Sequence, residues 1–449
     1  MISRFQYAIL YLKVTTFMKQ VRGVSMIKRD FYLRQIIRHM HNGEIKVITG
    51  IRRCGKSVLL FELFRDYLLE QGVTEEQIIT IELDQRKYYK YRNPITLCEY
   101  IETCISSNKS KQFYLFIDEV QFTKKVKDTE NDDIEVSIYD MLNELKSHKN
   151  LDVYVTGSNS KMLSSDIATE FRGRATQIRV YPFSFGEFYS YVGGDEQKAL
   201  DQYMLYGGMP RILQMTDDQD KKNYLSNLYS ELYIKDIVER NGVEREDILN
   251  NILDFLASQI SSLTNPTNVA NAIGSMRQEK VNSALVSAYI NHTIDAFLIR
   301  MAQRYDVKGK SYFNYPNKYY YTDVGLRNAR LNYRQYDPGH IMENIIYNDL
   351  IRRGYSVDVG VVVDRRNGGY VQKEVDFVVN HGDRRIYIQS ALQMGTEQKE
   401  SAELDSLKLT GDFFKKIIVR MDIPHNFYDD NGIFHCNLID FLLERVELF

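Results

Sequence analysis

The stretch Gly50-Ile51-Arg52-Arg53-Cys54-Gly55-Lys56-Ser57 matches the pattern G-x-x-x-x-G-K-[ST] of a phosphate-binding loop. Gly50 and Gly55 allow a backbone conformation in which several N–H groups point at phosphate oxygens. In such a loop Lys56 reaches the β- and γ-phosphates, and the Ser57 hydroxyl coordinates Mg²⁺. The pattern therefore predicts a nucleotide-binding segment that runs from Gly50 to Val58.

The flanking residues decide between this interpretation and a chance Gly-Lys turn. Residues 46–49 are typical of a short buried strand, and Val58-Leu59-Leu60-Phe61-Glu62-Leu63-Phe64 is typical of an amphipathic helix. Strand, loop and helix follow one another as the motif requires. We therefore assign nucleotide binding to Gly50, Ile51, Arg52, Arg53, Cys54, Gly55, Lys56, Ser57 and Val58.

A second apolar run supplies the acids that such a site needs. Phe113-Tyr114-Leu115-Phe116-Ile117-Asp118-Glu119 suits a strand buried on both faces of a parallel sheet, and it ends in two carboxylates. We expect Asp118 to hold the Mg²⁺ shell and Glu119 to act catalytically by polarising the attacking water. The alternative is an acidic loop after a strand, which the phosphate loop upstream disfavours.

The composition excludes several other classes of protein. At 449 residues the chain should form two or three domains, and its net charge of -2 gives no overall signal for nucleic-acid binding. Four scattered Cys without a C-x-x-C pair argue against a zinc site or a disulfide framework and predict a cytoplasmic protein. No stretch approaches the ~18 apolar residues of a membrane span, so we expect no membrane contact.

The first 25 residues are expected to lie outside the folded domains. Residues 5–17 are apolar but interrupted by Gln6, Lys13 and two Thr, and no small-residue cleavage site indicates a secretory signal. From Met26 the sequence runs directly into the first expected helix. Residues 1–25 are therefore interpreted as a poorly ordered leader.

Strands and helices alternate along the N-terminal part of the chain. Further strands are expected at residues 77–83 and 151–159, helices at 94–106 and 137–146, and a charged surface insertion at 124–135. This alternation predicts an α/β domain with a doubly wound parallel sheet and the nucleotide at its carboxyl edge.

Polar residues at the end of the fourth expected strand are further candidates. Thr156-Gly157-Ser158-Asn159 would lie beside Asp118, and a side chain there, with Ser158 as the catalytic candidate, can sense a γ-phosphate; a strand-to-helix cap fits equally well. Downstream, Arg172 or Arg174 can stabilise charge on a γ-phosphate, in its own or a neighbouring subunit. An Arg that only solvates the surface is the alternative for each.

Several motifs occur together in a fixed order. The loop at residues 50–57 is followed by Ile117-Asp118-Glu119-Val120-Gln121, Thr156-Gly157-Ser158-Asn159-Ser160, and Gly173-Arg174 with Tyr181-Pro182-Phe183-Ser184-Phe185. In this combination the chain resembles a prokaryotic family of AAA-type P-loop ATPases whose C-terminal half is a domain of unknown function. The resemblance covers residue 27 to the end and implies ATP as the nucleotide. It also implies an ATPase core at residues 26–210, closed by Gly207-Gly208-Met209-Pro210.

Residues 211–330 are expected to form a helical linker and a winged-helix domain. The helix at 228–240 can be a lid on the nucleotide or a connector, and we favour the connector. A winged helix can enter a DNA groove or serve as a packing module, and the expected recognition helix carries few Lys or Arg. The expected elements are helices at 248–261, 269–273 and 281–298 and a hairpin formed by 304–310 and 318–323.

Residues 331–449 resemble a small α/β restriction-endonuclease-like domain. Glu343 on a helix and Asp376 on a strand are acids that such folds use to hold Mg²⁺. The strand that should carry E-x-K instead contains Gln389-Ser390-Ala391, so Gln389 could still offer an oxygen while the Lys is missing. The domain is therefore predicted to be degenerate, with Glu343, Asp376 and Gln389 as a second metal site or as a purely structural set.

The leading hypothesis is a cytoplasmic, Mg²⁺-dependent ATPase whose C-terminal half couples the nucleotide state to DNA or to an unknown protein partner. The sequence is also compatible with a homo-oligomer. The rivals are an ATP-gated nuclease and a slow-turnover ATP-binding switch or scaffold. Asp118 and Glu119 favour turnover over binding alone, and Gln389-Ser390-Ala391 argues against the nuclease.

Overall fold

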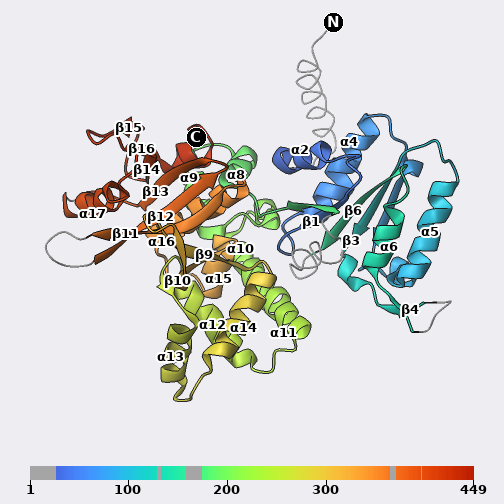
Figure 1. Cartoon of the computed structure of the whole chain (residues 1–449), viewed down its shortest axis with the longest axis horizontal. Helices are drawn as coiled ribbons and strands as arrows, with labels where there is room; N and C mark the ends of the chain where they lie inside the picture. The colour runs from blue at the N-terminus through green and yellow to red at the C-terminus, as the bar shows by residue number, and fades with distance from the viewer. Residues whose placement is uncertain (1–26, 129–132, 158–173, 365–370, 396) are drawn as a thin grey trace, which may run out of the picture.

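The computed structural model describes residues 27–128, 133–157, 174–364, 371–395 and 397–449. It contains an N-terminal α/β part and a larger C-terminal part built on a second sheet (Figure 1). Within the described ranges, no helix is both long and apolar enough to cross a membrane.

The N-terminal part has a five-stranded sheet in the order β2-β3-β6-β1-β7, and every pair in it is parallel. The predicted α/β core with a parallel sheet is thus confirmed. Its strands are β1 (Ile45–Thr49), β2 (Ile78–Glu82), β3 (Phe113–Asp118), β6 (Leu151–Gly157) and β7 (Ala175–Arg179). The helical segments are α2 (Asp30–Arg38), α3 (Lys56–Val58), η1 (Leu59–Phe64), α4 (Arg65–Glu70), η2 (Glu75–Gln77), η3 (Arg86–Arg92), α5 (Pro94–Ser106), η4 (Val120–Phe122) and α6 (Ile138–Leu145). A small hairpin pairs β4 (Val126–Lys127) with β5 (Glu135–Val136).

Local sequence explains where these elements lie. Strands β1, β3 and β6 are buried along their whole length, as continuous apolar runs in a parallel sheet should be. The rings of Phe64, Phe116 and Tyr154 meet across the helix and the sheet, with the Phe64 and Tyr154 centroids 4.8 Å apart. Asn93 caps α5 and Ser137 forms a capping box at the start of α6.

The C-terminal part is organised around one mixed sheet of nine strands, in the order β15-β16-β14-β13-β12-β11-β9-β10-β8. Its strands are β8 (Leu263–Thr264), β9 (Ile299–Asp306), β10 (Ser311–Tyr321), β11 (Ser356–Asp364), β12 (Val371–His381), β13 (Arg384–Ala391), β14 (Lys415–Arg420), β15 (Phe427–Tyr428) and β16 (Phe434–Asn437). The helices are α8 (Phe185–Val192), α9 (Glu196–Tyr206), η5 (Pro210–Gln214), α10 (Asp218–Asn227), η6 (Leu228–Ile234), α11 (Lys235–Asn241), α12 (Glu246–Ser258), α13 (Pro266–Arg277), α14 (Ser283–Asp295), α15 (Val324–Arg330), α16 (Pro338–Arg352), α17 (Glu397–Lys408) and α18 (Leu438–Leu442).

The expected division at residue 330 does not coincide with a break in this sheet. Strand β11 pairs in parallel with β9, so that Val359 lies opposite Arg304. The hairpin of β9 and β10 and the strands after α16 therefore form one continuous sheet. The physical reason is that a hairpin leaves an open edge with unpaired N–H and C=O groups, and another strand can pair with it.

The expected boundary at residue 210 would place helices α8 and α9 in the ATPase core, but both belong to the C-terminal part. Helices α8 and α9 lie beside the C-terminal sheet in Figure 1, and α9 packs against α15, α16 and α18. The buried Asp323 carboxylate closes this junction by accepting hydrogen bonds from the N–H of Gly208 (2.7 Å) and of Leu326 (3.0 Å). A Cβ at Gly208 would lie 2.1 Å from the Phe183 carbonyl oxygen, so this turn requires glycine.

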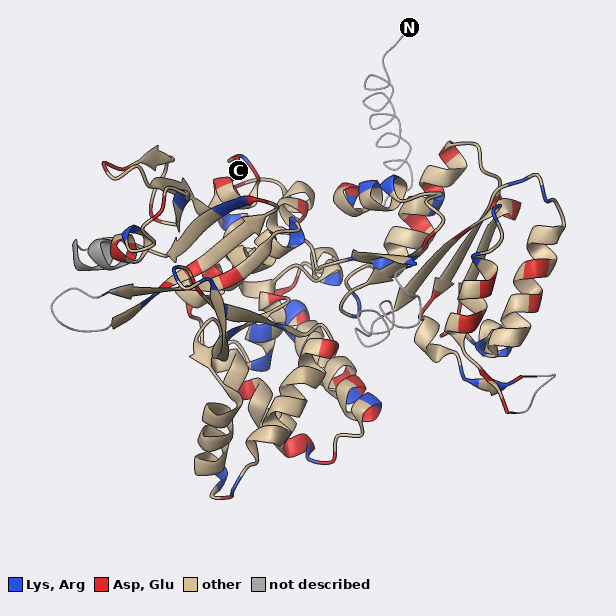
Figure 2. Ribbon diagram, in the orientation of Figure 1, with Lys and Arg blue, Asp and Glu red and all other residues tan. Residues whose placement is uncertain are grey.

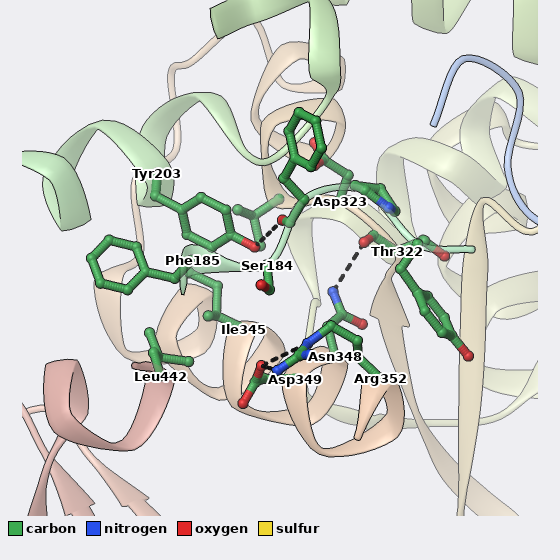
Figure 3. Close-up of a pocket in the computed structure, with 14 residues that line it drawn as sticks. Ser184, Phe185, Tyr203, Thr322, Asp323, Ile345, Asn348, Asp349, Arg352 and Leu442 are labelled. Carbon is green, nitrogen blue, oxygen red and sulfur yellow. Dashed lines mark hydrogen bonds and ion pairs between the residues drawn. The ribbon is translucent and has the colours of Figure 1, made fainter. Parts of the chain in front are cut away.

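A pocket at the same junction is closed by its own polar groups (Figure 3). The Tyr203 hydroxyl donates to the Phe183 carbonyl (2.8 Å), and the Asn348 amide donates to the Thr322 carbonyl (3.1 Å). The Arg352 guanidinium lies 2.9 Å from the Asp349 carboxylate. The stretch at residues 181–185 is thereby held to α9 through the Phe183 carbonyl.

Candidate functional site

The loop between β1 and α3 has the backbone that a phosphate site requires. Gly55 caps α3 in the left-handed region, with φ of 97°. Gly50 has φ of 146°, and a Cβ there would lie 2.1 Å from the Val180 carbonyl oxygen. The first-turn N–H groups of the helical run that starts at Lys56 have no acceptor within that run, as at any helix N-terminus, so they can donate to phosphate oxygens.

Lys56 lies inside this loop. Its side chain is buried, and its ammonium donates to the carbonyl oxygens of Gly50 (3.0 Å) and Ile51 (3.2 Å). A buried ammonium surrounded by loop backbone is a donor set that suits the oxygens of a polyphosphate. The loop residues therefore fit a nucleoside triphosphate.

Three oxygen-bearing side chains meet at the carboxyl edge of the sheet. The Ser57 hydroxyl donates to Oδ2 of Asp118 (2.8 Å), and the Thr156 hydroxyl donates to Oδ1 of the same carboxylate. Burial raises the pKa of Asp118, while the hydrogen bond from Thr156 lowers it. A set made only of hydroxyl and carboxylate oxygens is the kind that Mg²⁺ prefers, so these residues fit that ion.

Glu119 lies directly beside this group. Its backbone is in the left-handed region, with φ of 53°, and its N–H donates to the Thr156 hydroxyl oxygen (3.1 Å). Its carboxylate accepts a hydrogen bond from the Gln121 side chain. Thr156 thus contacts the Asp118 carboxylate and the Glu119 backbone N–H, whereas Ser158 lies outside the described residues, so the choice between a phosphate sensor and a helix cap for residues 156–159 stays a prediction.

The described structure places neither of the two candidate arginines at the phosphate loop. Arg172 lies outside the described residues. Arg174 is exposed and precedes β7, and its carbonyl accepts from the N–H of Ile45, the first residue of β1. The phosphate loop follows the other end of β1, about 16 Å away at the usual rise per residue. Because parallel pairing puts the starts of β1 and β7 at the same edge, Arg174 does not lie at the phosphate loop of its own subunit, and the alternative of a γ-phosphate in a neighbouring subunit stays a prediction.

A helix after the core lies on the phosphate loop. The Tyr233 hydroxyl of η6 donates to the Arg52 carbonyl (2.8 Å), and the Asp236 carboxylate of α11 lies 2.9 Å from the Arg52 guanidinium. Asp236 also pairs with Arg240 at 2.8 Å. Sequence reasoning favoured a connector for this helix and missed these residues, since nothing local in the sequence marks a contact with a loop so far away along the chain.

A second connection to the loop runs through Arg29, just before α2. This buried guanidinium donates to the carbonyls of Cys54 (3.3 Å) and Tyr181 (2.6 Å), and it lies 3.2 Å from the Glu187 carboxylate of α8. One side chain thus joins the phosphate loop to the first helix of the C-terminal part.

The acids of the expected second metal site converge on a lysine. The Lys318 ammonium of β10 lies 2.7 Å from Glu343, 2.6 Å from Glu374 and 3.5 Å from Asp376. Burial lowers the pKa of Lys318, but the carboxylates of Glu343, Asp376 and Glu374 outweigh that effect and raise it overall. Burial also raises the pKa of Glu343 to about 8, although Lys318 lowers it.

Other oxygen atoms that could have bound a metal at this site accept hydrogen bonds instead. Gln389 accepts from the Asp376 N–H (3.1 Å), and the Ser390 N–H donates to Oδ2 of Asp376 (2.9 Å). The Tyr320 hydroxyl donates to Glu343 (2.7 Å). Because a buried ammonium stands at the point where the carboxylates meet, this arrangement does not fit a metal ion. Sequence reasoning missed Lys318 because it comes from the hairpin, outside the segment that resembles a nuclease.

Comparison with known families agrees with this geometry. Residues 42–189 match the family described as an AAA domain, and residues 197–337 match a domain of unknown function (DUF8612). The fold and the loop thus define a protein with an AAA-type P-loop ATPase domain, as the sequence motifs indicated.

Relatives that match almost the whole chain define its family more closely. The chain is 33% identical over 428 residues to an uncharacterized protein of Haemophilus influenzae, covering 94% of this chain and 99% of that protein. It belongs to the same family as that protein. An uncharacterized protein of Methanocaldococcus jannaschii is 27% identical over 402 residues, with 84% and 80% covered.

Two solved structures are similar at lower identity. The Walker-type ATPase of Pyrococcus abyssi has 16% identity and a TM-score of 0.47, covering 68% of this chain and 96% of that one. The Aeropyrum pernix ORC1 protein, solved in complex with DNA, has 10% identity and a TM-score of 0.29, covering 69% and 93%.

Proposed function

We propose that this protein binds ATP with Mg²⁺ and hydrolyses it at the carboxyl edge of the core sheet. The observation that carries the proposal is the chain of contacts from Ser57 through Asp118 and Thr156 to Glu119. It brings a metal-binding hydroxyl, a metal-shell acid and a candidate base to one place beside the phosphate loop. The four free cysteines support the cytoplasm as the compartment.

Each residue then has a defined task. Lys56 exchanges its contacts with the loop carbonyls for contacts with the β- and γ-phosphate oxygens. Ser57 and Asp118 hold Mg²⁺, which supplies charge neutralisation on those phosphates when it is bound. Glu119, oriented by Gln121, positions the attacking water and draws off its proton.

The same contacts support coupling of the nucleotide state to the C-terminal half. Arg52 of the loop is paired with Asp236 of α11, and Arg29 links the loop carbonyl of Cys54 to Glu187 of α8. A change in the loop on nucleotide binding or hydrolysis must therefore shift contacts of both helices.

The order of elements from α12 to β10 supports a winged-helix assignment for residues 246–321. Three helices are followed by a hairpin, and β8 pairs with β10. Its capacity for a DNA contact is limited, because α14 carries no Lys or Arg and Arg277 of α13 is paired with Asp247 and Glu279. Figure 2 shows almost no blue on the helices α12, α13 and α14.

Residues 331–449 keep the order of elements of a restriction-endonuclease-like domain, and we propose that it serves binding or assembly. Lys318 neutralises the acids that a nuclease would use for its metal. This favours the ATPase over the ATP-gated nuclease.

The test is phosphate release from ATP with and without Mg²⁺. Lys56→Ala should weaken ATP binding, because the phosphates lose a cation, and Glu119→Gln should keep binding while losing turnover. Glu82→Gln is the matched control, since Glu82 ends the neighbouring strand opposite Asp118. Unchanged phosphate release in the first two variants contradicts the proposal. ATP binding by the wild type without any hydrolysis would support the slow-turnover switch instead.

A further inference from the structure

A basic and aromatic surface lies beside the candidate nucleotide site. The segment η3 follows β2, and residues 120–127 follow Glu119 at the end of the neighbouring strand β3. The Lys124 N–H donates to the Arg92 carbonyl (2.9 Å), and the Arg92 guanidinium lies 4.9 Å from the centre of the Phe122 ring. These contacts join residues 86–92 and 120–127 into one surface, which we call the basic surface.

The charge on this surface is concentrated and accessible. Residues 86–92 and 120–127 contain seven Lys or Arg and no Asp or Glu, whereas the whole chain has a net charge of -2; Glu135 of β5 lies opposite Lys127 of β4. Figure 2 shows blue, with some red, along the β4–β5 hairpin. An excess of exposed cations attracts a polyanion. The exposed cations are Arg86, Lys87, Lys90, Lys124, Lys125 and Lys127.

Aromatic rings alternate with these cations. Lys87 lies over the Tyr88 ring at 4.6 Å, Lys90 over Tyr91 at 4.7 Å and Arg92 over Tyr89 at 4.0 Å. The Tyr89 ring is 52% exposed although it is a large apolar group. An exposed ring among cations is the combination that lets a protein stack on a base while it contacts phosphates.

We propose that the basic surface binds single-stranded nucleic acid, with its cations on the phosphates and Tyr89 stacked on a base. Unpaired bases present the faces that such a ring needs, whereas duplex bases are stacked on each other. An acidic polypeptide would satisfy the cations but would leave Tyr89 without a role. This binding does not depend on ATP hydrolysis, and it lies on the core rather than on the winged-helix region.

The test is fluorescence anisotropy of a labelled oligo-dT of about 20 nucleotides, long enough to span a typical single-strand site, with the nucleotide-free full-length protein. The triple variant Lys87→Ala, Lys90→Ala, Lys125→Ala should bind at least about tenfold more weakly, with a salt slope smaller by about 2. Tyr89→Ala should bind about tenfold more weakly with the wild-type salt slope. The matched control is Lys308→Ala, Lys310→Ala, two exposed lysines in the turn between β9 and β10, and it should bind as the wild type does.

Several results would overturn the proposal. The first is that the wild type binds no oligo-dT, and the second is that both surface variants bind it as tightly as the wild type does. The third such result is a loss of affinity in the Lys308 and Lys310 control that equals the loss in the surface variants. Polyglutamate that binds as tightly as oligo-dT, with no effect of Tyr89→Ala, would assign the surface to an acidic protein partner. Because the substituted side chains are exposed, wild-type unfolding temperatures in all variants verify that the fold is intact.

Discussion

The Arg52 guanidinium of the phosphate loop lies 2.9 Å from the Asp236 carboxylate of α11, a helix that follows the core. Burial raises the pKa of Asp236, whereas Arg240 and Arg52 lower it. The pair ties the loop to the C-terminal half, and a bound γ-phosphate would compete with Asp236 for the same guanidinium.

Asp236→Ala should therefore tighten ATP binding by up to about fivefold, the effect expected from losing a partly exposed competing ion pair. The measurement is ATP titration by calorimetry in the Glu119→Gln background, which prevents hydrolysis. Glu239→Ala, an exposed acid on the same helix, should leave the affinity unchanged. Equal affinities in all three proteins would show that Asp236 does not compete with the nucleotide.

Arg174 can act on a γ-phosphate only from a neighbouring subunit, because it lies at the amino edge of its own sheet. We expect the rate of hydrolysis per subunit to rise with protein concentration, and Arg174→Ala to lose about 10³-fold of the turnover at high concentration. The exposed Lys149 near the same edge gives a control variant, Lys149→Ala, that should keep the rise. A rate that is independent of concentration in all three proteins would exclude the arginine finger.

Lys318→Met should destabilise the protein by about 3–5 kcal/mol, because it leaves Glu343 and its neighbouring acids buried without a counter-charge. Urea unfolding followed by fluorescence and circular dichroism measures the change in free energy. Lys373→Met, which breaks the more exposed pair with Asp405, should cost about 0–1 kcal/mol. Adding Glu343→Gln to Lys318→Met should restore part of the loss, and the absence of any loss in Lys318→Met would contradict the role assigned to its ammonium.

The C-terminal domain should not cut nucleic acid. Purified protein incubated with single- and double-stranded DNA and RNA, with ATP and either Mg²⁺ or Mn²⁺, should leave each substrate intact. The reason is that Lys318 occupies the acidic site and Ala391 stands where such folds carry a Lys. Cleavage that disappears in Asp376→Ala would establish the nuclease instead.

Asp323 should make stability depend on pH. Burial raises its folded-state pKa from 3.8 to about 6, against the hydrogen bond from the Gly208 N–H. The folded state therefore favours the protonated carboxyl group. The contribution of this group to the free energy of unfolding is fully present below pH 3.8 and is lost as the pH rises through about 6, a change of about 3 kcal/mol. The difference in unfolding free energy between the wild type and Asp323→Asn should fall by most of that amount between pH 4 and 7, and a constant difference would refute the assignment.

The sequence by itself determined the parts of this protein that depend on neighbours in the chain. The glycines and Lys56 of the loop act through local backbone geometry, and the apolar run before Asp118 is buried wherever it lies in a parallel sheet. Those two features were enough to predict the α/β core, the phosphate loop and the acids at the end of β3. Separately, the resemblance of residues 331–449 to a nuclease-like domain showed from the sequence that Gln389 and Ala391 depart from the E-x-K pattern.

Only the tertiary structure decided which distant residues meet. Parallel pairing of β1 with β7 places Arg174 far from the loop, the edge of β9 accepts β11 and merges two expected domains, and Lys318 enters an acidic site from another hairpin. Periodicity in a sequence indicates a strand or a helix and its buried face, but it does not specify its partner. Partners are selected by the packing and hydrogen bonding of the whole chain, so contacts such as Arg52 with Asp236 exist only once the fold has formed.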